Sequence, residues 1–208
     1  MRGIVSAAVI GIVALAVLGC GGPGETLRLS LNGDAVPVPE KMNTPLSVAV
    51  VPFEDLRDDK GTIGRYEHYV GRIVDTLVPG EGSAAEQITA FVEGYLKRAG
   101  FQVTRVDSAS AAGSADVVLS GQIESYWSEA VGEFARAKLT TKNRLVLKVA
   151  NTTDRSTFRT TLSAEDTSTV VFFEFADLEN ITSTSLGGNL SNFLSHVQVA
   201  GRSLTFKK

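Results

Sequence analysis

The chain of 208 residues contains a single cysteine, Cys20, and this thiol is the residue with the clearest chemistry. It stands where an apolar run gives way to glycine, in the stretch VLGCGG at residues 17–22. With no second cysteine there is no internal disulfide to form, even in an oxidising compartment. Cys20 is therefore either a buried spectator or the residue for which this stretch exists.

The residues that precede Cys20 have the layout of a signal peptide. In residues 1–19 one charge, Arg2, is followed by a run of Ile, Val, Ala and Leu that ends in small residues. The run is about 15 residues long, whereas a membrane-spanning helix needs about 20 apolar residues. We therefore expect residues 1–19 to be removed by cleavage.

The tripeptide Leu18-Gly19-Cys20 resembles the lipobox of bacterial lipoproteins. In that family the cysteine is alkylated by a diacylglyceryl group, the chain is cut just before it, and the new amine is acylated. The resemblance implies fatty acyl chains, such as palmitate, on Cys20, and each buried methylene adds about 0.8 kcal/mol to membrane binding. Because Gly21 and not an aspartate follows, it also implies the outer membrane. A plain signal peptide and an uncleaved anchor are the alternatives.

The charge of the mature chain argues against a nucleic-acid partner. From Cys20 onward it has 19 Lys and Arg against 23 Asp and Glu. Its 189 residues are enough for one domain with its own core. We expect a lipidated tether at 20–45 and a single periplasmic α+β domain at 46–208, and the sequence leaves the oligomeric state open.

The predicted tether is rich in residues that break regular structure. Residues 21–45 contain four prolines and four glycines, with one alternating piece, Thr26 to Leu31, as a candidate strand on the domain. A flexible coil of this length spans roughly 25 to 30 Å, and at full stretch about 80 Å. The folded body would then stand clear of the lipid surface.

Apolar periodicity predicts a short set of elements after the tether. Ser83 and Glu86 have the spacing of a capping box at the start of a helix that Gly100 ends. A second helix follows the apolar spacing of 177–197, with Gly187-Gly188 as a weak point or kink. A short apolar run rich in valine predicts a buried strand at 46–53. Alternation predicts strands at 101–106, 117–127, 135–151 and 156–165, while 54–82 is expected to be an ordered loop.

The order β-α-β-β-β-β-α predicts an α+β fold. We expect a two-layer sandwich in which a mixed or antiparallel sheet of about five strands carries two helices on one face. The other face of the sheet is then solvated or covered by a partner.

The residues that commonly carry catalysis or bind metals form no recognisable site. His68 and His196 are far apart in sequence, and no H-E-x-x-H or G-x-S-x-G motif occurs. The acidic cluster DLRDDKG at 55–61 lacks the alternating oxygen ligands of a calcium loop, and PGEGSAAE at 79–86 has no P-loop lysine. We predict a non-enzymatic protein without catalytic residues, metal or cofactor.

A row of cations on one strand is the main candidate for partner binding. The alternation of residues 135–151 places five of them on the face opposite the apolar side chains: Arg136, Lys138, Lys142, Arg144 and Lys148. Such a stripe fits an anionic partner, for example a lipid head group, a glycan or an acidic protein. Protection of an exposed strand against aggregation is the alternative.

Several strings resemble the YajG-like lipoproteins, a family of small outer-membrane lipoproteins. They are VAVVPFEDLRDDKGTIGR (48–65), FVEGYLKRAGFQV (91–103), ADVVLSGQIESYW (115–127), ARAKLTTKNRLVLKVANT (135–152) and FRTTLSAED (158–166). The similarity covers about residues 46–197. Wider resemblance extends to accessory lipoproteins of curli secretion and penicillin-binding-protein activation, and implies a binding module without a cofactor.

Two functions follow from these expectations. The first is a lipid-anchored accessory module that faces the periplasm from the outer membrane and docks onto an envelope protein or polymer. The second is the auxiliary lipoprotein of an ABC-type lipid transport system, which binds an apolar ligand between sheet and helices. A carrier needs an apolar cavity of about 300 Å³ or more, whereas a docking module has a filled core.

Overall fold

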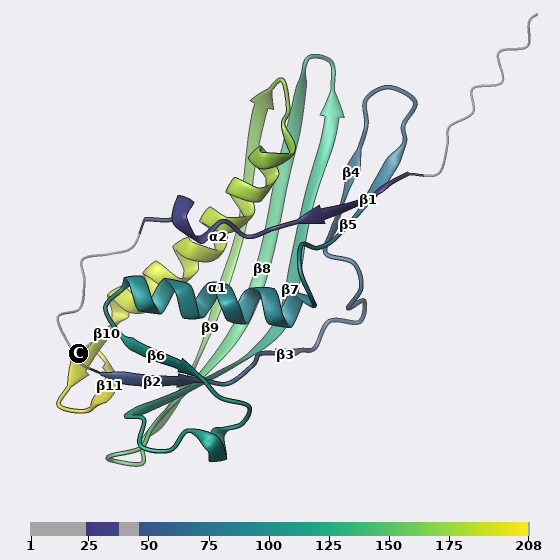
Figure 1. Ribbon diagram of the computed structural model, residues 1–208. Coiled ribbons are helices and arrows are strands. Elements are labelled where there is room, and N and C mark those ends of the chain that lie inside the picture. The colour runs from purple at the N-terminus through teal and green to yellow at the C-terminus, as the bar shows by residue number, and fades with distance from the viewer. Residues whose placement is uncertain (1–23, 38–45, 208) are drawn as a thin grey trace, which may run out of the picture.

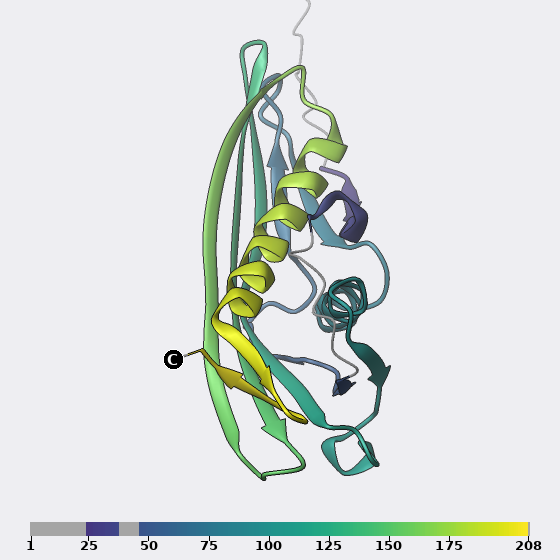
Figure 2. The same ribbon diagram turned by 90° about the vertical axis from the view of Figure 1, so that its left-hand side faces the viewer.

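The computed structural model describes residues 24–37 and 46–207, which fold into two layers (Figure 1). One layer is a nine-stranded mixed sheet, and a separate two-stranded hairpin lies beside it. Both helices cover the same face of the sheet and leave the other face open (Figure 2). The predicted α+β class is confirmed, but the sheet has nine strands where about five were expected.

Three long antiparallel strands form the body of the sheet. They are β7 (Val117–Glu133), β8 (Arg136–Asn151) and β9 (Thr157–Val171). The apolar side of β8 is the core side as predicted, since Leu139, Leu145, Leu147 and Val149 are at most 1% exposed. The turn between β7 and β8 lies at Phe134 and Ala135, and β7 runs beyond the predicted strand end at 127, because its alternation of buried and exposed side chains continues to Glu133.

The opposite edge of β7 pairs with three short strands in succession. These are β2 (Ser47–Val50), β3 (Glu54–Asp55) and β4 (Gly64–Glu67), all parallel to β7. β5 (Val74–Pro79) returns antiparallel to β4, and β6 (Gln102–Arg105) lies parallel to β2. The expected loop at 54–82 is therefore wrong: three strands lie within it. Strands of two to six residues carry little periodicity, and pairing with β7 is what orders them.

Helix α1 (Ala84–Arg98) follows its sequence signals closely. Ser83 accepts from the backbone N–H of Glu86, and the Glu86 carboxylate accepts from the N–H of Ser83, which completes the predicted capping box. Ile88, Val92 and Tyr95 are fully buried on the side that faces the sheet.

Helix α2 (Phe175–His196) is continuous through Gly187-Gly188, so the expected weak point is not a kink. A Cβ at Gly187 would come within 2.0 Å of the Val36 Cγ1, so glycine is needed there for close packing. Part of the buried face of α2 is polar: Asn143 on β8 donates to Ser185, and Asn189 donates to Asn143 at 2.5 Å. These bonds satisfy buried amides that apolar periodicity does not reveal.

The segment that precedes residue 38 is part of the domain. β1 (Thr26–Leu29) pairs in parallel with β5, and the short 3-10 helix η1 (Gly33–Ala35) follows. Leu29 and Val36 are buried in the core. The expected tether at 20–45 thus contributes residues 24–37 to the fold, while 20–23 and 38–45 lie outside the described residues.

The chain ends in a hairpin that the sequence did not predict. β10 (Val197–Ala200) and β11 (Ser203–Phe206) are antiparallel, and Asn151 at the end of β8 exchanges two hydrogen bonds with the backbone of Leu204. This exchange fixes the hairpin against the end of the sheet.

Candidate binding surfaces

Cys20 and the predicted signal peptide at 1–19 lie outside the described residues, but the position where the chain enters the fold is well defined. The backbone N–H of Glu25 donates to the buried Asp75 carboxylate at 2.8 Å, and Asp75 also contacts His68 at 2.6 Å. Both partners belong to the β4–β5 hairpin or its turn. The chain therefore enters the domain beside this hairpin.

The five cations of the predicted basic row all lie exposed on the open face of β8. β8 is an interior strand flanked by β7 and β9, so the row does not protect a sheet edge. Carboxylates pair with three of them: Glu133 with Arg136, Glu165 with Lys142 and Glu124 with Arg144. Only Lys138 and Lys148 have no ion-pair partner among the described residues.

The acidic cluster at 55–61 is organised around a buried arginine. Arg57 makes a two-pronged ion pair with Asp55, at 3.0 and 2.8 Å, and donates to the backbone carbonyls of Thr62, Tyr126 and Lys60. Burial alone would raise the pKa of Asp55, but the hydrogen bonds and charge of Arg57 outweigh it and lower that pKa. The carboxylate is thus occupied by a structural partner. Within 24–37 and 46–207 no cluster of three metal-ligating side chains occurs.

The two histidines occupy opposite ends of the fold. His68 lies at the β4–β5 turn, whereas His196 ends α2 and contacts the carbonyl oxygen of Asn192 at 2.8 Å. The structure does not bring them together, and each has a structural partner.

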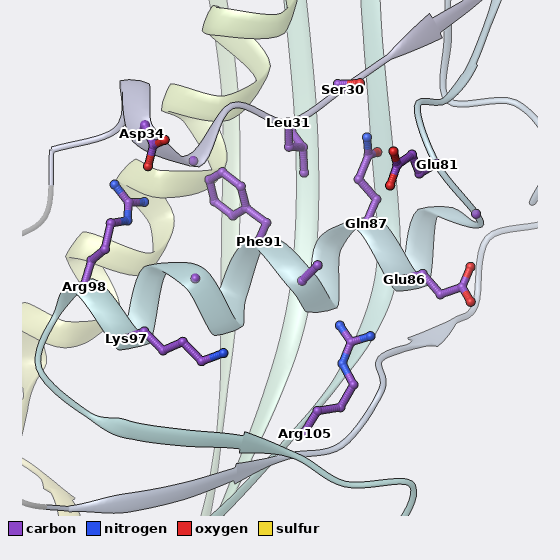
Figure 3. A pocket seen from close by; sticks show the side chains of 14 residues that line it. Ser30, Leu31, Asp34, Glu81, Glu86, Gln87, Phe91, Lys97, Arg98 and Arg105 are labelled. Carbon is purple, nitrogen blue, oxygen red and sulfur yellow. The ribbon is translucent and has the colours of Figure 1, made fainter.

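A groove along α1 is the candidate site that the sequence did not reveal (Figure 3). It has a volume of about 870 Å³ and is open to solvent. The segment from Ser30 to Asp34 forms one wall, and Arg105 of β6 lies on the other side of the helix. Ala90 and Gly94 form its floor, because both are exposed on the outer face of α1.

The groove carries charges of both signs toward each of its ends (Figure 3). Arg105 lies on the same side as Glu86 at the start of α1, and Asp34 lies near Arg98 of the last turn. Arg98 is held by a hydrogen bond to the carbonyl oxygen of Val36 at 3.0 Å. Such a charged hollow suits a polar partner more than an acyl chain.

The exposed Ala90 and Gly94, one turn apart, were the only signal in the sequence for this groove. The outer wall could not be predicted from the sequence, because it comes from the segment expected to be a tether. A groove built by a distant segment is not readable from the helix alone.

The centre of the space between sheet and helices is filled, and two smaller open hollows of about 450 and 330 Å³ lie between β9 and α2. Leu145 and Leu147 of β8, and Leu178 and Leu186 of α2, have no exposed surface. In the described part of the chain, neither helix is long and apolar enough to cross a membrane.

Comparison with known proteins places the fold. No family model matches the sequence, and the curated proteins give no match. A crystal structure of a Xanthomonas campestris protein of family DUF330 superposes with a TM-score of 0.55, over 82% of this chain and 93% of that chain, at 12% identity. This chain shares the DUF330 fold.

Looser superpositions include other bacterial proteins. Lipoprotein GNA1162 from Neisseria meningitidis matches with a TM-score of 0.37 and 12% identity, over 73% of this chain and 99% of that chain. A PelC dodecamer from Paraburkholderia phytofirmans matches with a TM-score of 0.40 and 14% identity, over 75% and 91%. At these identities the superposition with the DUF330 protein shows a shared fold and says nothing about activity.

Proposed function

We propose that this protein is a lipid-anchored, non-enzymatic accessory module of the bacterial outer membrane, which docks onto an envelope protein from the periplasmic side. Cys20 carries the lipid, by the resemblance of Leu18-Gly19-Cys20 to a lipobox. The YajG-like strings point to the same class of small lipoprotein.

The observation that carries the docking role is the position of the open space. The described residues pack the centre of the sheet–helix interior with fully buried leucines, and the hollow of about 870 Å³ lies outside it, along α1. The hollows between β9 and α2 are smaller, at about 450 and 330 Å³, and are also open to solvent. Six charged side chains line that groove: Asp34, Glu81, Glu86, Lys97, Arg98 and Arg105. A carrier of acyl chains needs the reverse arrangement, with an enclosed apolar cavity.

The auxiliary lipoprotein of an ABC-type lipid transport system stays a second candidate, in a modified form. The filled interior disfavours a ligand held between sheet and helices, but the same groove suits docking onto a transporter component. The identity of the docked protein separates a lipid transporter from other envelope machines.

In-cell crosslinking tests the docking role. A photoreactive residue at Ala90 on the groove floor should capture one defined envelope protein, and Gly94→Trp should abolish that capture because the indole fills the groove. Gly188→Trp is the matched control, since both glycines are exposed in a helix and a Cβ at either meets no atom within 4 Å. Capture that survives Gly94→Trp would remove the groove as the docking site.

The same cells test the anchor and the basic row. Intact mass of the envelope form should match a chain that starts at an acylated Cys20. A free thiol at Cys20 would rule out the lipid anchor.

Crosslinking also tests the basic row. Docking would be assigned to this row if a partner is captured through Lys138 or Lys148 and the capture is lost when Lys138, Lys142 and Arg144 are changed to Glu.

A further inference from the structure

Large apolar side chains are exposed at three turns of the protein. The β4–β5 turn carries Tyr69 and Val70, at 52% and 79% exposure, and the β7–β8 turn carries Phe134 at 80%. Val171, the last residue of β9, and Phe172, which begins the connection to α2, are 65% and 82% exposed. We call these five side chains the apolar tip.

Strand register places the three turns at one end of the sheet. Glu67, the last residue of β4, pairs with Val131 near the end of β7. Arg136, which opens β8, pairs with both Glu133 and Val171. The rings of Tyr69 and Phe134 lie 6.3 Å apart, and Figure 1 shows the three turns at the top of the molecule.

Folding does not explain this cluster. The hydrophobic effect favours such rings in the protein interior and not on the surface. In addition, a bulky residue rarely adopts a positive φ. Phe172 nevertheless has a φ of 58° and is the most exposed member of the tip. The β8–β9 turn, at the other end of the sheet, carries only polar side chains at Thr152, Thr153 and Asp154. The turns at the two ends of the sheet therefore differ in polarity.

The chain enters the fold at the apolar end. Glu25 is bonded to Asp75, and a Cβ at Gly24 would come within 1.7 Å of the carbonyl oxygen of Val74, the residue that opens β5. Gly24 is the fourth residue after Cys20, so the two lie at most about 14 Å apart even in a fully extended chain. An acyl group on Cys20 thus keeps this end of the domain close to the bilayer surface.

We propose that the apolar tip inserts into the interface of the same bilayer that anchors Cys20. This inference rests on the proposed acylation of Cys20. Aromatic and apolar side chains insert at the boundary between head groups and acyl chains, because this removes their apolar surface from water. Arg72 and Arg136 lie beside the tip, each paired with a glutamate. The tip orients the domain, and the acyl chains retain it.

Tryptophan fluorescence tests the insertion directly. Trp127 is the only tryptophan of the chain and lies on the open face of β7, about 23 Å along the strand from Phe134. The lipidated full chain is placed in phosphatidylethanolamine and phosphatidylglycerol vesicles with brominated acyl chains. In a Trp127→Phe background, Phe134→Trp and Phe172→Trp should be quenched several-fold more than the native Trp127, with blue-shifted emission.

Thr153→Trp in the polar turn is the matched control and should stay unquenched. If quenching at the tip is no greater than at Trp127 or at position 153, the tip does not insert into the bilayer. This conclusion holds whether water, another protein or a second copy covers the tip. Intact mass of the same samples separates this result from failure of the anchor. An acylated chain without quenching at the tip rules out insertion of the tip but not the lipid anchor. A chain that is quenched and vesicle-bound but not acylated rules out the anchor but not insertion. An unacylated chain that does not bind the vesicles rules out both.

Discussion

Arg57 is the single side chain on which the 55–62 segment depends. Arg57 and Asp55 are 8% and 9% exposed, so Arg57→Met would leave a buried carboxylate without its partner. Loss of one member of a buried ion pair costs about 3–5 kcal/mol. We expect a loss of this order in the free energy of unfolding, measured by urea denaturation.

Arg65→Met is the control for that measurement. Arg65 also pairs with a glutamate, Glu129, but half of its side chain is exposed. Exposed pairs contribute about 0–1 kcal/mol, so Arg65→Met should change the free energy of unfolding little. Equal losses in both variants would contradict the structural role of Arg57.

Asp116 makes the free energy of unfolding depend on pH in the acidic range. Burial alone would raise its pKa, but hydrogen bonds from the backbone and hydroxyl of Ser47, together with Arg202, lower it. The folded pKa is below the unfolded value of about 3.9, so the unfolded chain binds the proton more tightly. The stabilisation is fully present above the unfolded pKa and is lost as pH falls through the folded pKa.

Asp116→Asn should therefore destabilise the protein at pH 7 by about 1–3 kcal/mol, since the Ser47 donors lose a charged acceptor. The difference from the native chain should shrink below the unfolded pKa. Urea midpoints from neutral pH down to acid measure this convergence. A constant difference at all pH values would mean that the Asp116 carboxylate does not carry the effect.

At the scale of elements, two adjacent glycines of α2 should respond in opposite ways to alanine. A Cβ at Gly187 meets Val36 at 2.0 Å, whereas a Cβ at Gly188 meets nothing within 4 Å. Gly187→Ala should cost about 1–3 kcal/mol through overpacking. Gly188→Ala should stabilise by up to about 1 kcal/mol, because glycine is a poor helix former.

Urea denaturation of both variants gives the comparison, and Val36→Ala should recover part of the loss in the Gly187→Ala chain. Stabilisation by Gly187→Ala would contradict the contact between α2 and the segment that follows η1. The same pair explains why the expected kink is wrong: the glycines were interpreted as flexible, but Gly187 is required by a segment about 150 residues earlier in the chain.

The elements that sequence predicts well carry their own information. α1 has a capping box and an apolar stripe, and β8 alternates along its whole length, so both were located closely. β4 and β5 were missed because their order comes from pairing with β7 and with each other. The groove was missed for the same reason, since Leu31 and Asp34 become its wall only when β1 pairs with β5.

At the scale of the whole molecule, the surfaces have a definite relation to the anchor. With the apolar tip at the bilayer, the long strands β7, β8 and β9 lead away from the lipid (Figure 1). The basic row then extends along the exposed face of β8. Helix α1, which carries the groove, lies on the opposite side of the sheet (Figure 2). With the proposed lipid on Cys20, the anchor and the described fold are joined by residues 20–23, fewer than the tether expected at 20–45.

This short connection gives the last prediction. A flexible Gly/Ser segment several times longer than Cys20–Pro23, inserted before Pro23, lowers the effective concentration of the tip at the bilayer, roughly as the −3/2 power of length. Quenching of the Phe172→Trp variant by brominated lipid should therefore fall, while intact mass still reports an acylated Cys20. The same segment inserted at Thr153, in the turn remote from the tip, should leave quenching unchanged. Quenching that is insensitive to the first insertion would mean that the tip binds lipid without help from the short connection.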